Sequence, residues 1–185
     1  MNKPQLQPTR HISDLLIGRQ SISDARYFLT FCEVRRRPGL VDPIVAQKLK
    51  HSLNRIHASG DLSLVAATVM PDHVHLLGIL GQRLSLSRAI GKFKADTHRY
   101  LRSHGLEWQE NYHDHRLRHE NEYEPFARYI FLNPYRAGLI QLNDQWPSWW
   151  RWGDLRFEFE AMAAQTGGVP RAWLGDPDPE GAVDL

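Results

Sequence analysis

The spacing of hydrophobic and polar residues along this 185-residue chain changes several times, and the changes predict alternating strands and helices. Short runs rich in apolar, aromatic and β-branched residues predict strands at 27–34, 62–70, 73–80 and 108–117. Longer stretches with apolar residues every three or four positions predict helices at 42–58, from Ser85 or Ser87 to about 104, and at 122–133. The resulting order of strand, helix, two strands, helix, strand and final helix predicts the α+β class, as a ferredoxin-like split βαβ sandwich with an antiparallel sheet.

Local signals mark where some of these elements begin or end. Asp42 followed by Pro43 is typical of a helix start, with the aspartate as N-cap and the proline in the first helical position. Pro71 and Asp72 predict a tight turn that joins two of the strands into a hairpin. Pro134 should end the third helix, because the residue before a proline avoids the helical conformation.

The two ends of the chain differ in composition from its middle. Residues 1–20 have few apolar positions and are expected to form an N-terminal arm, whereas 21–152 carry the predicted domain. The C-terminal extension, 153–185, is rich in Gly, Pro and Asp from about 167 and is expected to be largely disordered from there. Positions 167–185 hold one basic and four acidic residues, which leaves 22 basic and 17 acidic residues, a net charge of +5, for positions 1–166. A positive body favours a polyanionic partner.

The composition also excludes several classes of protein. Hydrophobic residues make up 42% and charged residues 24% of the chain, which is ordinary for a soluble globular protein. No apolar run approaches the ~20 residues that a membrane helix needs, and the polar stretch 1–10 resembles neither a signal peptide nor a transit peptide. Cys32 is the single cysteine, which excludes an internal disulfide and a cysteine-based zinc cluster. We therefore expect a cytoplasmic protein without a membrane partner.

His73 and His75 lie one residue apart at the start of a short apolar run. Alternate side chains of a strand point to the same face, so both imidazoles should be close enough to bind one metal ion. A site with only two or three protein ligands would leave room for substrate oxygens. By itself the pair is weak evidence, because the ten histidines of the chain form a second such pair, His113 and His115.

A second block of sequence raises the weight of this pair. The sequence at 127–139 is ARYIFLNPYRAGL, and the sequence around the histidines, at 70–77, is MPDHVHLL. With these two blocks in this order and at this separation, the chain resembles the REP-associated tyrosine transposases, relatives of the IS200/IS605 single-tyrosine transposases. Those enzymes belong to the HUH superfamily, named for histidine–hydrophobic–histidine. The resemblance covers roughly residues 20–152 and implies a fold of the HUH endonuclease type.

The resemblance implies roles for residues of both blocks. Tyr129 matches the family's nucleophile, and Asn133 matches a polar residue near its metal; the two lie four positions apart and therefore on one helix face. His73 and His75 would hold a divalent metal, Mg²⁺ or Mn²⁺, with Asn133 as the expected third ligand. Because a phenol has a pKa near ~10, such a cation is needed close to the tyrosine. The implied reaction is metal-dependent cleavage and rejoining of single-stranded DNA at palindromic repeat hairpins, through a 5′-phosphotyrosine intermediate.

Basic residues supply candidates for DNA contact. Those on the second predicted helix recur at steps of three, four and seven, which gathers them on one face: Arg88, Lys92, Arg99 and Arg102. Such a face either contacts DNA phosphates or is only solvated, and the sequence leaves both interpretations open. Arg136, in the second matched block, is a further candidate for DNA contact.

A cluster of tryptophans near the end of the predicted domain also has two interpretations. Its members are Trp146, Trp149, Trp150 and Trp152, with Arg151 among them. Exposed indole rings next to a basic residue stack on unpaired bases. Packing of a C-terminal segment onto the domain is the more common use of such a cluster, and we favour it.

Two other functions fit the same residues. A metal-dependent nuclease that uses water in place of Tyr129 would leave no covalent adduct with DNA, whereas a tyrosine transposase would. A hairpin-binding regulator would keep the fold without turnover. Single-stranded DNA with hairpin structure is the expected partner, and the sequence does not decide between a monomer and a homodimer.

Overall fold

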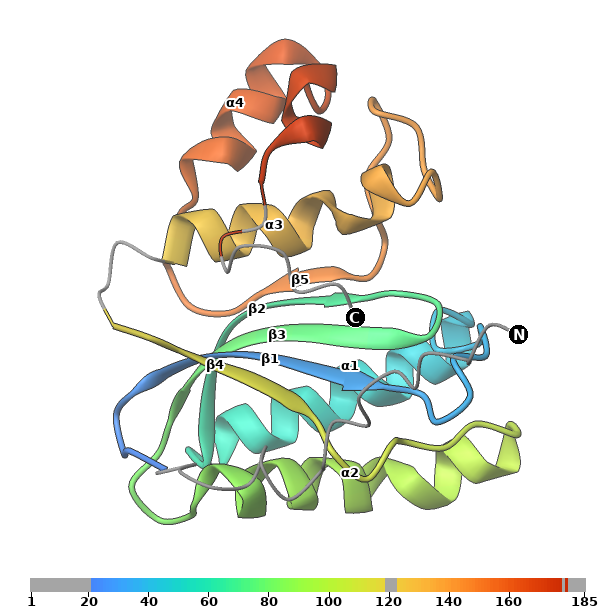
Figure 1. Cartoon of the computed structure of the whole chain (residues 1–185), viewed down its shortest axis with the longest axis vertical. Coiled ribbons are helices and arrows are strands. Elements are labelled where there is room, and N and C mark those ends of the chain that lie inside the picture. The colour runs from blue at the N-terminus through green and yellow to red at the C-terminus, as the bar shows by residue number, and fades with distance from the viewer. Residues whose placement is uncertain (1–20, 119–122, 178, 180–185) are drawn as a thin grey trace, which may run out of the picture.

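The computed structural model describes residues 21–118, 123–177 and 179, and it contains a five-stranded sheet with helices on both faces (Figure 1). The strands are β1 (Arg26–Cys32), β2 (Leu62–Val69), β3 (His73–Leu80), β4 (His113–Leu117) and β5 (Trp149–Arg151). The helices are α1 (Pro43–Ala58), α2 (Leu86–Ser103), α3 (Tyr123–Arg136) and α4 (Glu158–Thr166), with a 3-10 helix, η3 (Arg171–Gly175). None of the helices in this part of the chain is long and apolar enough to cross a membrane. The predicted N-terminal arm, 1–20, lies outside the described residues.

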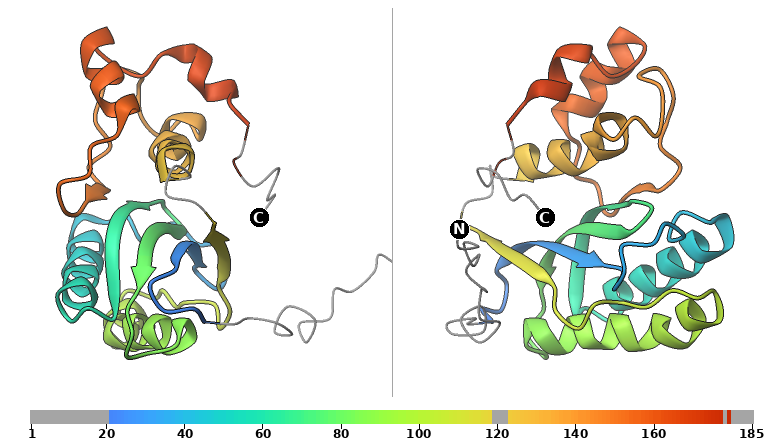
Figure 2. Two further views of the ribbon diagram at one scale, coloured as in Figure 1. Left: turned by 90° about the vertical axis from the view of Figure 1, so that its left-hand side faces the viewer. Right: turned by 45° about the vertical axis from the view of Figure 1, so that its right-hand side comes forward.

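The sheet has the strand order β4-β1-β3-β2-β5, and every neighbouring pair is antiparallel. Strands β1 to β4, with α1 and α2 between them, form the β-α-β-β-α-β unit predicted from the sequence, so the ferredoxin-like α+β fold is confirmed. β5 extends this unit at the β2 edge. α1 and α2 cover one face of the sheet and α3 covers the other, which gives three layers (Figures 1 and 2).

Each face of the sheet has its own hydrophobic core. The alternation of β1 shows the division: Tyr27, Leu29 and Phe31 pack with α1 and α2, whereas Phe28 packs with Ile130 of α3. Because α3 covers its face of the sheet, polar side chains on that side of the strands lie between two layers. Their positions are therefore fixed by packing.

The helices of the first layer begin where the sequence predicts. The side chain of Asp42 accepts hydrogen bonds from two backbone N–H groups of the first turn of α1, and Pro43 is its first residue. Ser85 caps α2 in the same way by accepting from the backbone N–H of Arg88. These caps stabilise α1 and α2, the two helices that cover the face of the sheet opposite to α3.

α3 continues past Pro134 to Arg136, so the prediction that Pro134 ends this helix is wrong. A proline inside a helix has no N–H to donate and leaves the carbonyl four residues earlier without its usual partner. Here that carbonyl belongs to Ile130, and the hydroxyl of Thr68 on β2 donates to it at 2.8 Å. The sheet replaces the missing hydrogen bond, and the helix crosses the proline.

The fourth strand is shorter than the prediction of 108–117, because it begins only at His113. Trp108 forms an isolated bridge with the residue that follows β1. The ammonium group of Lys94 on α2 binds the backbone carbonyls of three consecutive residues, 109–111. The carbonyls of 109–111 thus accept hydrogen bonds from the Lys94 side chain, and the regular pairing of β4 with β1 begins only at His113.

The C-terminal extension is more ordered than predicted. Gly167 ends α4 in the left-handed conformation, with φ 73°, and η3 follows against α3. The guanidinium of Arg128 lies 4.2 Å from the ring centroid of Trp173 and pairs with Asp176 at 2.6 Å. The expected disorder is therefore wrong for 167–177, where aromatic and ionic contacts with α3 offset the Gly- and Pro-rich composition.

Candidate functional site

His73 and His75 lie next to each other on β3, on the face of the sheet that α3 covers. Their Nε2 atoms are 3.1 Å apart, and the two ring planes are nearly perpendicular, at 84°. His75 is buried, whereas the side chain of His73 keeps 13% of its surface exposed. The pair therefore presents two convergent nitrogens, one on a buried ring and one on a ring that is partly exposed.

The outer nitrogen of each imidazole has a fixed partner. His73 Nδ1 lies 2.7 Å from a carboxylate oxygen of Asp72, and His75 Nδ1 lies 2.9 Å from the hydroxyl of Thr30. Since a carboxylate only accepts, Nδ1 of His73 carries the proton and its Nε2 keeps a lone pair. Thr30 is placed opposite His75 by the antiparallel register of β1 and β3. Contacts of this kind orient imidazoles that bind a metal.

The surroundings keep both histidines neutral at neutral pH. Burial lowers the pKa of His73, and the nearby Asp72 carboxylate opposes this effect only in part. For His75, burial again is the main cause, and the electrostatic influence of His73, Arg36 and His113 lowers its pKa further, well below its ordinary value. Neutral imidazole is the form that binds a metal ion.

Tyr129 reaches the same pair from α3. The centroid of its ring is 5.8 Å from that of His75, edge to face, and it also meets the edge of Phe28 at 6.1 Å. Phe28 in turn stacks on His75 at 5.4 Å. The structure thus brings together three residues that the sequence places on two distant blocks, His73, His75 and Tyr129.

A divalent metal fits the donor set. The two Nε2 atoms, 3.1 Å apart, are close enough to bind the same ion, and imidazole nitrogen is a common metal ligand. Within the described residues no group of three or more His, Cys, Asp and Glu forms a metal site. Asn133, the predicted third ligand, donates its amide N–H to the Tyr129 carbonyl at 3.1 Å, and no described contact joins it to either histidine.

A family model described as Transposase IS200 like matches residues 21–125, which is more than half of the chain and includes both histidines. The chain belongs to the IS200-like transposase family. The resemblance recognised in the two sequence blocks is therefore confirmed, although Tyr129 lies just beyond the matched range.

Two curated relatives of this IS200-like chain extend the comparison. The REP-associated tyrosine transposase of Escherichia coli (strain K12) is 22% identical over 131 residues, which covers 70% of this chain and 78% of the relative. A relative from Haemophilus influenzae is 25% identical over 130 residues, covering 62% of this chain and 68% of the relative.

A solved structure matches nearly the whole chain. It is a REP-associated tyrosine transposase bound to a REP hairpin, with a TM-score of 0.63, 22% identity and coverage of 97% of this chain and 99% of the other. The likeness supports the α+β fold and includes the C-terminal helices that lie beyond the family model.

Arg136 lies near the tyrosine but is engaged by the chain's own C-terminal segment. Its guanidinium is 5.5 Å from the ring centroid of Tyr129. It also donates hydrogen bonds to the backbone carbonyls of Trp173 and Asp176, at 3.2 and 3.0 Å. Of the five basic residues predicted to bind DNA, Arg136 is the one that adjoins the candidate site.

The predicted basic face of α2 lies on the opposite side of the sheet from the histidines (Figure 1). Arg88, Arg99 and Arg102 are exposed there. Lys92 instead pairs with the carboxylate of Asp61, a buried side chain whose pKa is lowered mainly by this hydrogen bond. The structure therefore separates this face from the candidate site of the IS200-like domain.

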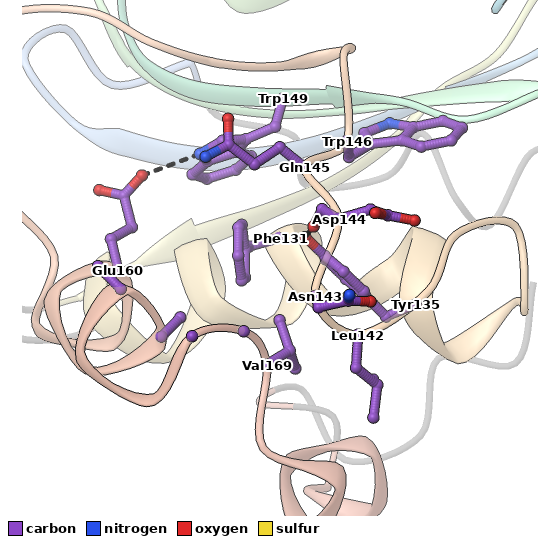
Figure 3. Close-up of a pocket in the computed structure, with 14 residues that line it drawn as sticks. Phe131, Tyr135, Leu142, Asn143, Asp144, Gln145, Trp146, Trp149, Glu160 and Val169 are labelled. Carbon is purple, nitrogen blue, oxygen red and sulfur yellow. Dashed lines mark hydrogen bonds between the residues drawn. The ribbon is translucent and has the colours of Figure 1, made fainter.

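The tryptophan cluster packs as the sequence analysis favoured. The four indole N–H groups donate to Val69 O, Glu160 Oε1, Pro147 O and Asn54 Oδ1. Trp146 and Trp149 line a cavity of about 570 Å³ between α3, α4 and the loop before β5, and Figure 3 shows the bond from Trp149 to Glu160 at its edge. None of the predicted site residues lines this cavity, so it is separate from the histidine pair.

Three residues of the candidate site were missed by sequence reasoning. Asp72 adjoins His73 in the matched block and was interpreted only as a turn residue. Thr30 has no sequence signal, because its place opposite His75 depends on strand register. Arg36, whose guanidinium pairs with Asp72 at 2.9 Å, was one of three adjacent arginines with nothing to single it out.

Proposed function

We propose that this chain cleaves and rejoins single-stranded DNA at hairpins through a covalent intermediate on Tyr129. The observation that carries the proposal is the pair of neutral imidazoles with Nε2 atoms 3.1 Å apart, together with the 5.8 Å between the ring centroids of His75 and Tyr129. The names of the E. coli relative and of the solved structure, which mention REP, support hairpin DNA as the substrate class.

His73 and His75 are the residues that would hold Mg²⁺ or Mn²⁺ through their Nε2 atoms. Asp72 and Thr30 keep these nitrogens aimed at one point by binding the outer nitrogens. A bound divalent ion supplies charge stabilisation at the phosphate and at a nearby phenolate oxygen. We retain Asn133 as a proposed third ligand, through its amide oxygen, because its N–H donates to the helix backbone and leaves that oxygen available.

Tyr129 is the proposed nucleophile. Its phenolic oxygen forms a bond to the phosphorus of the scissile phosphodiester, while the bond from phosphorus to the 3′ oxygen breaks. The 5′ phosphate of the downstream strand is then linked to Tyr129, and the departing oxygen takes up the proton that the phenol gave up, so the upstream strand ends in a free 3′ hydroxyl. The Arg136 guanidinium lies over the ring of Tyr129, 5.5 Å from its centroid, so a positive charge adjoins the proposed nucleophile. Rejoining reverses the same two bonds, so no nucleotide cofactor is needed.

The exposed arginines of α2, Arg88, Arg99 and Arg102, are proposed to contact phosphates of the folded hairpin away from the cleaved bond. Arg136 is proposed to bind DNA next to Tyr129. We omit Lys92 from this surface, because its ammonium group is paired with the Asp61 carboxylate. The reaction is proposed to take place in the cytoplasm, and whether one or two copies act together is left to experiment.

Incubation with hairpins that carry single-stranded flanks tests the proposal. With Mg²⁺ or Mn²⁺ the chain should cut the single-stranded flank and form an adduct that survives a denaturing gel. Excess EDTA should abolish both products. His73→Ala should remove cleavage while hairpin binding persists, since other residues supply the phosphate contacts. Equal cleavage in EDTA would overturn the metal assignment.

Two alternatives remain separable by the same gel. A water-using nuclease would cut the DNA without an adduct, and a hairpin-binding regulator would bind without cutting. The edge contact between Tyr129 and His75 favours the tyrosine mechanism, because it places the phenol beside the proposed metal ligands.

A further inference from the structure

Arg36, in the loop between β1 and α1, has an unusual backbone conformation. Its φ is 54°, in the left-handed region that residues with a Cβ rarely adopt. Among the described residues, Asp24 is the only other non-glycine residue with a positive φ. Conformations of this kind persist where the surroundings enforce them, and they concentrate at functional sites.

A buried carboxylate enforces this conformation. Glu33 is fully buried, and one of its oxygens accepts hydrogen bonds from the backbone N–H groups of Arg35 and Arg37, at 2.7 and 2.9 Å. The other oxygen binds the guanidinium of Arg37. Both neighbours of Arg36 are thus tied to one side chain, which restrains the backbone between them.

The Arg36 side chain lies beside the histidine pair, because it shares the Asp72 carboxylate with His73. Its Nε lies 2.9 Å from the Asp72 carboxylate that also binds His73, and its Nη1 donates to the sulfur of Cys32 at 2.8 Å. Cys32 lies directly opposite His73 in the register of β1 and β3. The guanidinium is therefore held on two sides, at the edge of the candidate site.

The remaining N–H groups of this guanidinium donate to no described residue, and the side chain is 40% exposed. An arginine has five N–H donors in a planar fork that matches the oxygens of a phosphate. Because two of its donors bind Asp72 and Cys32, the Arg36 guanidinium is already oriented in the absence of a ligand. Burial of the surroundings strengthens such a charge-assisted hydrogen bond.

We propose that Arg36 binds the phosphate directly next to the cleaved phosphodiester and so sets the register of the DNA strand over His73 and Tyr129. This assignment rests on the proposed function of the site. A purely supporting role would need only the bond to Asp72, whereas the exposed donors and the enforced left-handed backbone direct the group toward a ligand.

The adjacent arginines provide matched comparisons. Arg35 is exposed, and no described contact involves its guanidinium, so Arg35→Gln removes an equal charge from the same loop. Arg37 is bound to the buried Glu33 and is unsuitable as a control, because its removal would disturb the loop. Arg36→Gln removes the guanidinium but keeps a side chain of moderate length.

The experiment measures single-turnover cleavage of hairpins in which one phosphate at a time is replaced by an uncharged methylphosphonate, with the cleaved phosphate left intact. Arg36→Gln should slow cleavage of the unmodified hairpin about 10- to 100-fold, and Arg35→Gln should change it less than about 3-fold. One methylphosphonate, next to the cleaved bond, should slow the wild-type chain by a similar factor but should not slow Arg36→Gln further.

Equal slowing of the wild-type chain and of Arg36→Gln by every methylphosphonate would overturn the proposal and leave Arg36 as a support for Asp72. If Arg36→Gln does not fold, Arg36→Gly serves in its place, because glycine suits the left-handed backbone and also lacks the guanidinium. A wild-type chain that forms no adduct on the unmodified hairpin would instead overturn the proposed function itself.

Discussion

Thr68 and Ile130 are joined by a hydrogen bond that ties α3 to the sheet beside the histidines. The Thr68 hydroxyl donates to the Ile130 carbonyl at 2.8 Å, and Thr68 pairs directly with His75 in the register of β2 and β3. Tyr129 immediately precedes Ile130 on the helix, so the same bond restrains the distance from Tyr129 to His75. A helix that Pro134 would otherwise weaken is thereby held in place at the candidate site.

Thr68→Val tests this restraint. Valine keeps the shape of the side chain but leaves the buried Ile130 carbonyl without a donor, so the free energy of unfolding should fall by about 1–3 kcal/mol. Cleavage should slow because Tyr129 is less firmly placed, while hairpin affinity stays near the wild-type value. Urea denaturation and single-turnover cleavage measure the two effects.

Pro134→Ala provides the control. Alanine restores a backbone N–H that can bind the Ile130 carbonyl within the helix, so Thr68→Val should cost clearly less stability in this background. The same cost in both backgrounds would show that the Thr68 hydroxyl does not compensate for the proline.

Glu33 should make the free energy of unfolding depend on pH under acidic conditions. Burial would raise its pKa, but hydrogen bonds from the Arg37 guanidinium and from the backbone N–H groups of Arg37 and Arg35 outweigh it and lower the pKa below the ordinary 4.5. The ionised group therefore stabilises the folded state above about pH 4.5, and this contribution is lost as the pH falls through the lowered pKa. Glu33→Gln should flatten that part of the curve of unfolding free energy against pH; parallel curves for the two chains would contradict the assignment.

Trp173 tests the order of the C-terminal segment. Trp173→Ala removes the ring beneath the Arg128 guanidinium and should lower the free energy of unfolding by about 1–2 kcal/mol. It should also raise hairpin affinity, because η3 no longer holds Arg128 and Arg136. Met162→Ala, on the exposed side of α4, serves as the control and should change neither quantity. Unchanged stability in Trp173→Ala would restore the original expectation of a disordered segment.

The salt dependence of hairpin binding tests whether the exposed arginines of α2 contact DNA phosphates. If Arg88, Arg99 and Arg102 contact phosphates, replacing all three with alanine should reduce the slope of log affinity against log salt by about 2, at about 0.7 for each contact to a single strand. Fluorescence anisotropy at several salt concentrations gives this slope. An unchanged slope would mean that the face is only solvated, in keeping with its position on the far side of the sheet.

The sequence predicted the fold well wherever local signals agree with the final packing. The hairpin at Pro71 and Asp72, the capped starts of α1 and α2, and the β-α-β-β-α-β order all follow from turn chemistry and hydrophobic spacing. It failed where a distant contact overrides a local preference. Thr68 carries α3 past Pro134, and Trp173 holds a segment whose composition predicts disorder.

The candidate site was predictable only in part. His73 and His75 follow from strand alternation, and Tyr129 followed from the matched block. Thr30 contacts His75 because the register of β1 and β3 places the two residues opposite each other, and this register cannot be deduced from the sequence. Arg36 depends on a loop shaped by Glu33, so its contact with Asp72 was visible only once the backbone was known.

The identity of the residue joined to DNA tests the proposed mechanism most directly. Chain trapped on a cleaved hairpin with Mn²⁺ should yield, after proteolysis, a peptide with a nucleotide linked through its 5′ phosphate to Tyr129, and Tyr129→Phe should give neither adduct nor cleavage. Tyr135 is an unsuitable nucleophile, because its hydroxyl donates to the Asp144 carbonyl at 2.9 Å and burial raises its pKa. An adduct on Tyr100 or Tyr135, or full cleavage by Tyr129→Phe with no adduct on any residue, would contradict the assignment of Tyr129.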